Sequence, residues 1–514
     1  MSKTIIIIGA GLAGLSAALQ AAENGCNVKL VSSLPSERAQ SVMAEGGINA
    51  ALNTKDENDS PEEHFTDTIK AACGLADPNA VWGMTQAAPE LVHWLLKLGV
   101  KFNMSGYDDV DLRNFGGQKK KRTAFAQSDT GKQIMTAMID AVRRKEASGM
   151  VERFSHHSFL TLRLCGNICC GCVIRDEYSQ ETVELPGDAV IVATGGMHGL
   201  FGNTTGSLSN TGEVTAELFR LGVPLANGEM IQYHPTTVKC GGKRMLISEA
   251  ARGEGGRLFA MKDGKQWYFM EEKYPELGNL MPRDITAREI WKVSHESEVF
   301  LDMMEISEEI ISNKLSGLAD DCMTYLHKDI RKEPVSVLPG IHYFMGGILV
   351  DEQHRTPIQN LYAAGECCAQ YHGANRLGGN SLLGALYGGR VAAKSACEQA
   401  DVVDLSCATQ IDFPPASQIS EIKQLNKVMQ ETMGVVRNEN TLLNGIQTVQ
   451  ALTGNLPLLG MAVLKSALAR KESRGAHWRE DYPKSNDDDY LKTTVARFDG
   501  KQIQISFVPV PERR

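Results

Sequence analysis

Two absences narrow what this chain can be. No stretch of its 514 residues approaches the roughly eighteen uninterrupted apolar residues that a membrane-spanning helix needs. Basic charge is not in excess either, since 53 Lys and Arg stand against 62 Asp and Glu, for a formal net charge of -9. A general nucleic-acid binder needs such an excess to neutralise phosphates. We therefore expect no transmembrane segment in this chain and no nucleic-acid partner.

We also expect no secretory leader. Lys3 is followed directly by the apolar run Ile5–Ile8 and a glycine turn, without the longer apolar region and small-residue cleavage site of a signal peptide. This start predicts a cytoplasmic location, with any attachment to a membrane made peripherally through partner subunits.

The cysteine pattern does not suit a metal centre. Cys165, Cys169, Cys170 and Cys172 are crowded together and lack the two paired C-x-x-C units of zinc or iron-sulfur sites. Residues 159–175 have the pattern of a hairpin with Gly166-Asn167 at its turn, so we expect these thiols to be buried small hydrophobes and expect no metal. The run Lys119-Lys120-Lys121-Arg122 is likewise predicted to be a solvated basic strip.

The composition is that of a globular protein with more than one core. Hydrophobic residues make up 42% and charged residues 22% of the chain. Its length exceeds what a single hydrophobic core usually supports, so two or three packed units are expected.

The N-terminus has the pattern of a nucleotide-binding βαβ unit. A β-branched run at Thr4–Ile8, a helical pattern at Leu15–Ala22 and a second strand at Asn27–Ser32 follow one another. Between the first two lies Gly9-Ala10-Gly11-Leu12-Ala13-Gly14, which fits the G-x-G-x-x-G fingerprint for a pyrophosphate at a helix N-terminus. The acidic residue expected after the second strand is replaced by Ser32-Ser33, so hydroxyl groups would have to contact the ribose.

Later segments indicate an α/β fold with an insertion. Further buried strands are predicted at 188–193 and 360–364, each followed by glycine. We expect a discontinuous Rossmann-like domain over 1–222 and 341–400, an inserted α+β capping domain over 223–340, and a mainly helical C-terminal domain over 401–514. In the last region, 418–433 and 456–471 are the clearest helices, and 493–509 has strand character.

Nine further motifs, in order along nearly the whole chain, resemble the flavoprotein subunits of succinate dehydrogenase and fumarate reductase and their relative L-aspartate oxidase. They are Ser33–Gly47, Thr194–Gly196, Gln232–Thr236, Glu249–Gly255, Pro282–Asp284, His342–Gly347, Gly365–Cys367, His372–Ser381 and Ala469–His477.

The resemblance implies FAD as the cofactor, fumarate or succinate as the dicarboxylate substrate, and an iron-sulfur partner subunit for electron transfer. The implied cofactor-binding residues are Gly9, Ala10, Gly11, Leu12, Ala13, Gly14, Ser32, Ser33, Gln40, Ser41, Ala44, Glu45, Gly46, Gly47, Thr194, Gly195, Glu213, Tyr343, Glu366, Arg376, Asn380, Ser381 and Leu382.

The resemblance also implies the catalytic residues. Arg283 is expected to be the general acid, resupplied with protons through Glu249 and Arg252, and His234 is expected to polarise the substrate. The implied substrate-binding residues are His342, Arg376, Ser248, Phe115 and Gly116. Cationic and hydrogen-bonding groups of this kind stabilise the negative charge that develops when a hydride adds to a C=C bond.

Three positions depart from the family. Gln40 occupies the place of the histidine that bonds covalently to the flavin in the membrane-bound enzymes, so we expect noncovalent FAD and a preference for fumarate reduction. Phe115 stands where L-aspartate oxidase has a glutamate that pairs with the substrate ammonium, which makes aspartate oxidation the second choice. Glu213 replaces a common aspartate, which leaves that flavin contact open.

Two alternatives come from other classes of protein. A non-catalytic flavin scaffold that passes electrons within a complex is disfavoured by the presence of Arg283 and Arg376. A nicotinamide-dependent oxidoreductase is disfavoured because only one G-x-G-x-x-G fingerprint occurs.

Overall fold

The computed structural model describes residues 2–106, 109–401, 411, 413 and 418–514.

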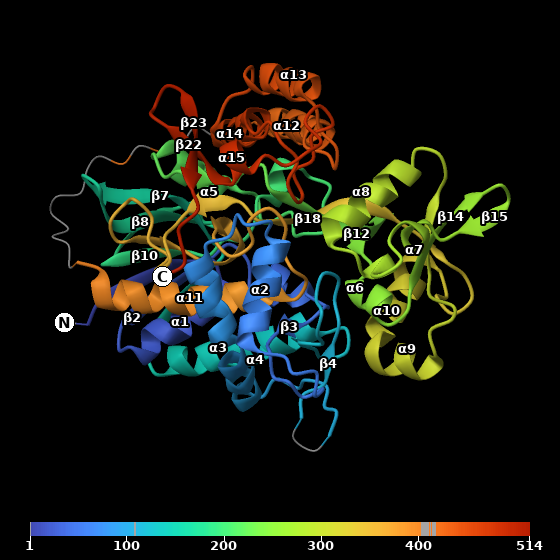
Figure 1. The fold of residues 1–514 in the computed structure, drawn as a ribbon. Helices are drawn as coiled ribbons and strands as arrows, with labels where there is room; N and C mark the ends of the chain where they lie inside the picture. Colours follow the sequence, from blue (N-terminus) through green and yellow to red (C-terminus); the bar gives the residue numbers. More distant parts are fainter. Residues whose placement is uncertain (1, 107–108, 402–410, 412, 414–417) are drawn as a thin grey trace.

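The centre of the molecule is a parallel sheet. Five strands lie in the order β20-β10-β1-β2-β6. Figure 1 labels β10 and β2 of this sheet. Their bounds are β1 Thr4–Ile8, β2 Asn27–Ser32, β6 Val151–Ser155, β10 Ala189–Val192 and β20 Leu361–Ala363. The four strands predicted for this sheet are confirmed, two of them one residue shorter at each end.

Both faces of the sheet are covered, which is why its strands are apolar throughout. Ile5 and Ile7 belong to the core that the sheet shares with the helices, whereas Ile6 and Ile8 pack on the opposite side. The helices of the first core are α1 Leu12–Glu23, α3 Pro78–Leu98, α4 Thr130–Ala147 and α11 Asn380–Gln399. Helix α2 Pro61–Ala71 packs on α3. Helix α1 contains the predicted helix and adds three residues before it and one after it.

A separate antiparallel sheet packs on the other face. Its strands are β7 His157–Cys165, β8 Ile168–Asp176 and β9 Thr182–Pro186. The predicted hairpin with its turn at Gly166-Asn167 is thus confirmed, and Cys169, Cys170 and Cys172 are buried as expected. Cys165 differs from the prediction, because it is half-buried at the end of β7 and disulfide-bonded.

An α+β segment protrudes from the central sheet at one end (Figure 1, yellow-green). It contains the three-stranded sheet β13-β12-β18 and the four-stranded sheet β15-β14-β16-β17. The strands are β12 Ile231–Cys240, β13 Lys243–Leu246, β14 Arg257–Lys262, β15 Lys265–Trp267, β16 Val299–Asp302, β17 Val335–Ser336 and β18 Leu338–Phe344. Its helices are α6 Glu249–Gly253, α7 Phe269–Lys273, α8 Arg283–Val293, α9 Glu308–Lys314 and α10 Ser316–Asp321.

The C-terminal region is helical and then returns to strands (Figure 1, red). Its elements are α12 Ile419–Thr432, α13 Glu439–Val449, α14 Asn455–Ala469, α15 Asp487–Tyr490, β22 Lys492–Phe498 and β23 Ile503–Pro509. The two predicted helices and the terminal strand character are confirmed. Strands β22 and β23 join a sheet with β11 Leu225–Ala226, β19 Gly347–Leu349 and β21 Cys368–Ala369.

Short elements complete the described part of the chain. They are β3 Ile48–Asn49, β4 Leu112–Arg113, β5 Thr123–Ala124, α5 Glu213–Arg220 and the single turns η1 Ser36–Arg38, η2 Gln40–Met43, η3 His198–Leu200, η4 Gly278–Leu280, η5 Cys322–Leu326 and η6 Gly365–Cys367. Within the described ranges, no helix combines the length and hydropathy needed to cross a bilayer.

The predicted basic strip is wrong at Arg122. Its side chain is fully buried, with Nε and Nη2 donating to the two carboxylate oxygens of Asp59 at 3.1 and 2.8 Å. Its Nη1 lies 3.0 Å from an oxygen of Asp67. Lys119 and Lys121 are exposed as expected. Arg122, the last residue of the run, is therefore buried because it pairs with two buried carboxylates. A count of local charges does not reveal these partners.

We expect Arg122→Ala to lower the free energy of unfolding by about 3–5 kcal/mol, because it leaves buried carboxylates without their partner. The exposed neighbour provides the matched control, and Lys121→Ala should change stability by about 0.5 kcal/mol or less. Denaturant unfolding of both variants measures this difference. Equal midpoints for the two variants would contradict the burial of Arg122 as the stabilising feature.

Candidate functional site

A cavity of about 580 Å³ opens at the carboxyl ends of β1 and β10, beneath the protruding α+β segment. Nineteen of the predicted cofactor-binding residues besides Arg376 and Tyr343 line its wall. They are Gly9, Ala10, Gly11, Leu12, Ala13, Ser32, Ser33, Gln40, Ser41, Ala44, Glu45, Gly46, Gly47, Thr194, Gly195, Glu213, Glu366, Ser381 and Leu382. The end of a parallel sheet is where open α/β folds bind ligands.

The glycine fingerprint brings the start of α1 against β10. Gly9 has φ +111°, and a Cβ there would lie 2.2 Å from the carbonyl oxygen of Ala193. Gly14 does not line the cavity. A Cβ on it would lie 1.8 Å from the carbonyl oxygen of Gly9, so this glycine permits the close packing of helix on turn. The backbone N–H of Leu12 donates to Ser41 Oγ at 3.2 Å, which joins the fingerprint to the next cofactor loop.

Asn380 also lies behind the cavity wall rather than in it. Its Oδ1 accepts from Asn49 Nδ2 at 2.7 Å and lies 2.9 Å from His64 Nε2, while its Nδ2 donates to Thr68 Oγ1 at 3.0 Å. Asn380 is the first residue of α11, so this buried network fixes the helix N-terminus that presents Ser381 to the cavity.

Several polar atoms in the wall suit a bound dinucleotide. Ser32 Oγ and Glu45 Oε2 are buried without a hydrogen-bond partner among the described residues. Burial, together with the nearby carboxylate of Asp321, raises the pKa of Glu45 to about 8. The positive charge of Arg113 lowers this pKa, but its effect is smaller. A bound group with donors and hydroxyls would satisfy these atoms. The residues present therefore fit FAD.

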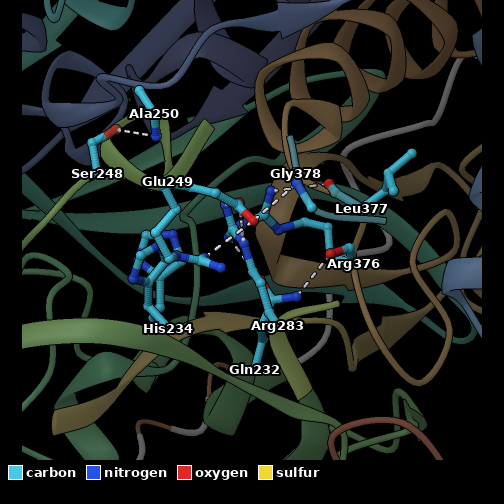
Figure 2. A network of polar contacts seen from close by, with 12 residues as sticks. Gln232, His234, Ser248, Glu249, Ala250, Arg283, Arg376, Leu377 and Gly378 are labelled. Atoms are coloured by element: carbon cyan, nitrogen blue, oxygen red, sulfur yellow. Dashed lines mark hydrogen bonds and ion pairs between the residues drawn. The ribbon is translucent and has the colours of Figure 1, made fainter. Parts of the chain in front are cut away.

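At the other end of the cavity three charged side chains form a chain, and Figure 2 labels two of them, Glu249 and Arg283. Arg283 donates from Nε and Nη2 to Glu249 Oε2 at 2.8 and 2.6 Å. Arg252 Nη2 donates to the other carboxylate oxygen of Glu249 at 3.3 Å. Arg283 and Glu249 line the cavity, whereas Arg252 lies behind them. The structure thus brings together the three residues predicted for proton delivery.

Local sequence explains how this chain is held. Ser248 is the N-cap of α6, with its Oγ accepting from the N–H of Ala250 at 3.4 Å, so Glu249 begins the helix. Arg283 is the first residue of α8 and follows Pro282. Burial raises the pKa of Glu249, but the positive charges of Arg283 and Arg252 outweigh it and hold the pKa below its ordinary value. Glu249 is therefore an ionised acceptor between two guanidinium groups.

The predicted substrate-binding groups surround Arg283. His234 and His342 lie with their ring centroids 5.1 Å apart, and the guanidinium of Arg376 lies 4.4 Å from the centre of the Tyr343 ring. Burial, followed by the charge of Arg283, holds the pKa of both histidines well below its ordinary value. Burial and the same charge lower the pKa of Arg376 to about 9, so it is cationic at neutral pH.

Arg376 and His234 each have a buried nitrogen that the described residues leave unpaired. Neither Arg376 Nε nor His234 Nε2 has a hydrogen-bond partner among the described residues, although both atoms are buried. Such atoms are costly unless a ligand satisfies them. One buried cation and two neutral imidazoles beside Arg283 make a site for an anion.

Phe115 and Ser248 line this end of the cavity, and Gly116 does not. The ring of Phe115 fills the space against Gly46 and Gly378, where a Cβ would lie 2.8 and 2.9 Å from ring atoms. Gly116 instead donates its N–H to Glu249 Oε1 at 3.2 Å, so it contacts the carboxylate from behind the wall.

The sequence analysis did not single out two polar residues at this end of the site, of which Thr205 lines the cavity and Gln232 lies behind its wall. Gln232 accepts from Arg283 Nη1 at 3.1 Å and donates to the carbonyl oxygen of Arg376 at 2.8 Å, so it bridges the two arginines (Figure 2). Thr205 lines the cavity, and its Oγ1 lies 2.7 Å from His342 Nδ1. Gln232 belongs to the motif Gln232–Thr236, but it was given no role there. The loop that contains Thr205 has no recognisable sequence motif.

The β12–β13 hairpin also reaches the cavity. Cys240, Lys243, Arg244 and Met245 line it, and Arg244 Nε donates to Thr237 Oγ1 at 2.5 Å. Nothing in their spacing marked these residues beforehand. Of the methionines near the site, Met230 is buried in a core cluster, in line with a packing role.

Two known protein families match successive parts of this chain. Residues 4–382 match the family described as FAD binding domain, and residues 452–513 match the fumarate reductase flavoprotein C-terminal family. The succinate dehydrogenase flavoprotein subunit of Bacillus subtilis is 38% identical, over 100% of this chain and 98% of that protein. The 8-methylmenaquinol:fumarate reductase flavoprotein subunit of Wolinella succinogenes is 32% identical, over 100% of this chain and 92% of that protein.

A solved structure shows the same likeness. A mutant form of the E. coli quinol fumarate reductase protein FrdA superposes with a TM-score of 0.90 at 27% identity, covering 99% of this chain and 97% of that chain. The expected Rossmann-like FAD-binding fold with an α+β cap and a helical C-terminal region is thereby confirmed. This chain belongs to the succinate dehydrogenase and fumarate reductase flavoprotein family and is an FAD-dependent oxidoreductase.

Proposed function

We propose that this chain reduces fumarate to succinate with noncovalently bound FAD. The observation that carries the proposal is the buried chain Arg252–Glu249–Arg283, which ends on the wall of the cavity beside Arg376 and the two histidines. A dicarboxylate needs cationic and neutral donors at its carboxylates and a proton source near its double bond. This arrangement offers both in a protein whose net charge is negative.

When bound, reduced FAD would supply a hydride to one carbon of the double bond, and the chain would supply the proton to the other carbon. Arg283 Nη1 already contacts Gln232, and its Nε and Nη2 point to Glu249. A guanidinium gives up a proton only when another group replaces it at once, because its ordinary pKa exceeds 12. Glu249 and Arg252 lie in line to provide that replacement.

The remaining groups hold the substrate carboxylates. Arg376 brings the full positive charge, and its Nε, which has no partner among the described residues, is a donor. His234 and His342 are neutral, so each binds a carboxylate oxygen as a hydrogen-bond donor rather than as a cation. Donors aimed at both carboxylates stabilise the charge that develops as the hydride adds.

The direction follows from the mode of cofactor binding. Gln40 lines the cavity where the family has its flavin-bonded histidine, and an amide cannot make that bond. In the family the covalent link raises the flavin potential. Without it, succinate is harder to oxidise, which favours fumarate reduction.

The runner-up is aspartate oxidation. Phe115 is 2% exposed and lines the substrate end of the cavity, where an ammonium group would need a counter-charge. An apolar ring cannot provide one, and a buried unpaired cation is strongly disfavoured. The arrangement of Arg283 and Arg376 speaks likewise against a non-catalytic scaffold.

The electron donor is proposed to be a separate iron-sulfur subunit. The family resemblance suggests it, and the B. subtilis and W. succinogenes relatives are named as flavoprotein subunits. A cytoplasmic position, peripheral to a membrane through such a partner, is part of the same proposal.

Acid precipitation of the purified protein should leave FAD in the supernatant, because Gln40 offers no imidazole for a covalent bond. Absorbance of the supernatant and flavin fluorescence of the protein band on a denaturing gel measure the two fractions. A fluorescent protein band that retains the flavin would show that another side chain has formed the bond.

Replacing the two arginines should produce defects of different kinds. Arg283→Ala should lower fumarate turnover by about 10²–10⁴-fold, the usual effect of losing a general acid, while succinate binding stays close to normal. Arg376→Ala should weaken succinate binding about tenfold or more as well, since it removes a charged anchor from the ground state. Turnover, apparent affinity and the flavin spectral change on adding succinate separate the two.

The matched control lies on the same helix. Arg288 on α8 stacks on Trp478 at 4.0 Å and does not line the cavity, so Arg288→Ala should retain turnover. Arg283→Lys keeps the charge with a different reach, and partial recovery of activity would agree with proton delivery. Wild-type turnover of Arg283→Ala with normal FAD content would remove this residue from the mechanism.

A further inference from the structure

Thr205 occupies a fixed place beside a predicted substrate ligand. It lies in the segment between η3 and α5, and its backbone N–H donates to the carbonyl oxygen of Ile341 at 3.0 Å. His342 follows Ile341 in β18, and the backbone bond places the Oγ1 of Thr205 2.7 Å from Nδ1 of His342. Both side chains line the cavity. The contact therefore joins a loop to a strand across the site.

Neighbouring contacts hold this segment rigidly. Thr204 Oγ1 lies 3.0 Å from His198 Nδ1 and accepts from the N–H of Gly206 at 3.2 Å. The carbonyl oxygen of Thr204 accepts from the N–H of Arg244 on β13 at 3.2 Å. The hydroxyl of Thr205 is thus held in position by bonds that do not involve its own side chain.

The hydroxyl hydrogen has two acceptors within reach. One is His342 Nδ1 at 2.7 Å, and the other is the carbonyl oxygen of Ile341 at 3.4 Å, which already accepts the N–H of Thr205. The shorter contact has the usual length of a strong hydrogen bond from a hydroxyl, and the longer one is at the limit. The shorter contact favours a hydroxyl hydrogen that points to Nδ1, and in that arrangement Nδ1 carries a lone pair.

This choice matters because His342 is neutral. Burial lowers the pKa of its imidazole well below the ordinary value, and the charges of Arg283 and Arg376 lower it further. A neutral imidazole has one donor and one acceptor nitrogen. A carboxylate accepts hydrogen bonds only, so His342 can bind one only if the nitrogen that faces the cavity carries the hydrogen.

We propose that Thr205 is a positioning residue that holds His342 in the tautomer with hydrogen on Nε2, so that this nitrogen donates to a substrate carboxylate. The identity of the ligand as a dicarboxylate rests on the proposed function. The tautomer itself does not, because it is a property of the resting protein.

The predicted change is specific to one hydroxyl. Thr205→Val has nearly the same shape and keeps the backbone bond to Ile341, but it cannot donate to Nδ1. His342 should then lose its preference for the Nε2–H tautomer, and the protein should bind succinate about tenfold more weakly, as expected on loss of a hydrogen bond to a charged group. Thr205→Ser retains the donor and should restore both properties.

The experiment uses the FAD-loaded protein with ¹⁵N-labelled histidine. Long-range ¹H–¹⁵N spectra distinguish a protonated from an unprotonated ring nitrogen, and the spectrum of His342→Gln identifies the signals of His342 by their loss. Succinate affinity is taken from the flavin spectral change. The matched control is Thr432→Val on α12, a threonine whose hydroxyl donates to the carbonyl of its own helix at 2.7 Å, and it should alter neither property.

The outcomes separate this proposal from the proposed function. A wild-type His342 with hydrogen on Nδ1, or a Thr205→Val protein that keeps the Nε2–H tautomer, would overturn the role of Thr205. So would succinate binding that is unchanged in Thr205→Val. If instead the tautomer depends on Thr205 as expected but fumarate is not reduced, the proposed reaction fails while the positioning role stands.

Discussion

The site depends on one buried carboxylate. Glu249 is 2% exposed, and its two oxygens accept hydrogen bonds from Arg283, from Arg252 and from the backbone N–H of Gly116. Without it, two guanidinium groups would lie close together in a buried place with no counter-charge, an arrangement that costs several kcal/mol. The carboxylate thereby fixes the direction of Arg283 and joins α6 and α8 to the segment that carries Phe115.

The same carboxylate explains how an acidic protein can bind an anion. The net charge of the whole chain is -9, yet Arg283, Arg252 and Arg376 gather around a single Glu249 at one end of the cavity. Burial, followed by this positive charge, lowers the pKa of His234 and His342 well below its ordinary value, so both are neutral. In the proposed function, the site binds a carboxylate through buried cationic groups and through directional hydrogen bonds, and the direction of the bond from His342 depends on the neighbouring Thr205.

Much of the fold could be predicted because its signals are local. The β-branched run at Thr4–Ile8, the glycine fingerprint and the Gly166-Asn167 turn each act within a few residues, and all three elements form where they were expected. The family motifs likewise predicted most of the cofactor-binding residues that line the cavity. The limits between the three predicted domains and the catalytic role of each residue stay predictions.

What the sequence could not reveal depends on distant partners. Arg122 is buried because Asp59 and Asp67 come to meet it, and Gly14 and Asn380 support the cavity from behind instead of lining it. Thr205 gains its role only when a loop packs against β18. In each case the residue type and its local sequence do not indicate its place, because its contacts come from segments that are distant in the sequence.

The most direct measurement of the central claim is a steady-state assay of the purified, FAD-loaded protein with reduced viologen and fumarate, run beside one with aspartate and oxygen. The site described above predicts viologen oxidation that depends on fumarate and forms succinate, with little peroxide formed from aspartate. Aspartate-dependent peroxide formation at a rate comparable to that of fumarate reduction, or no reaction with fumarate, would contradict it.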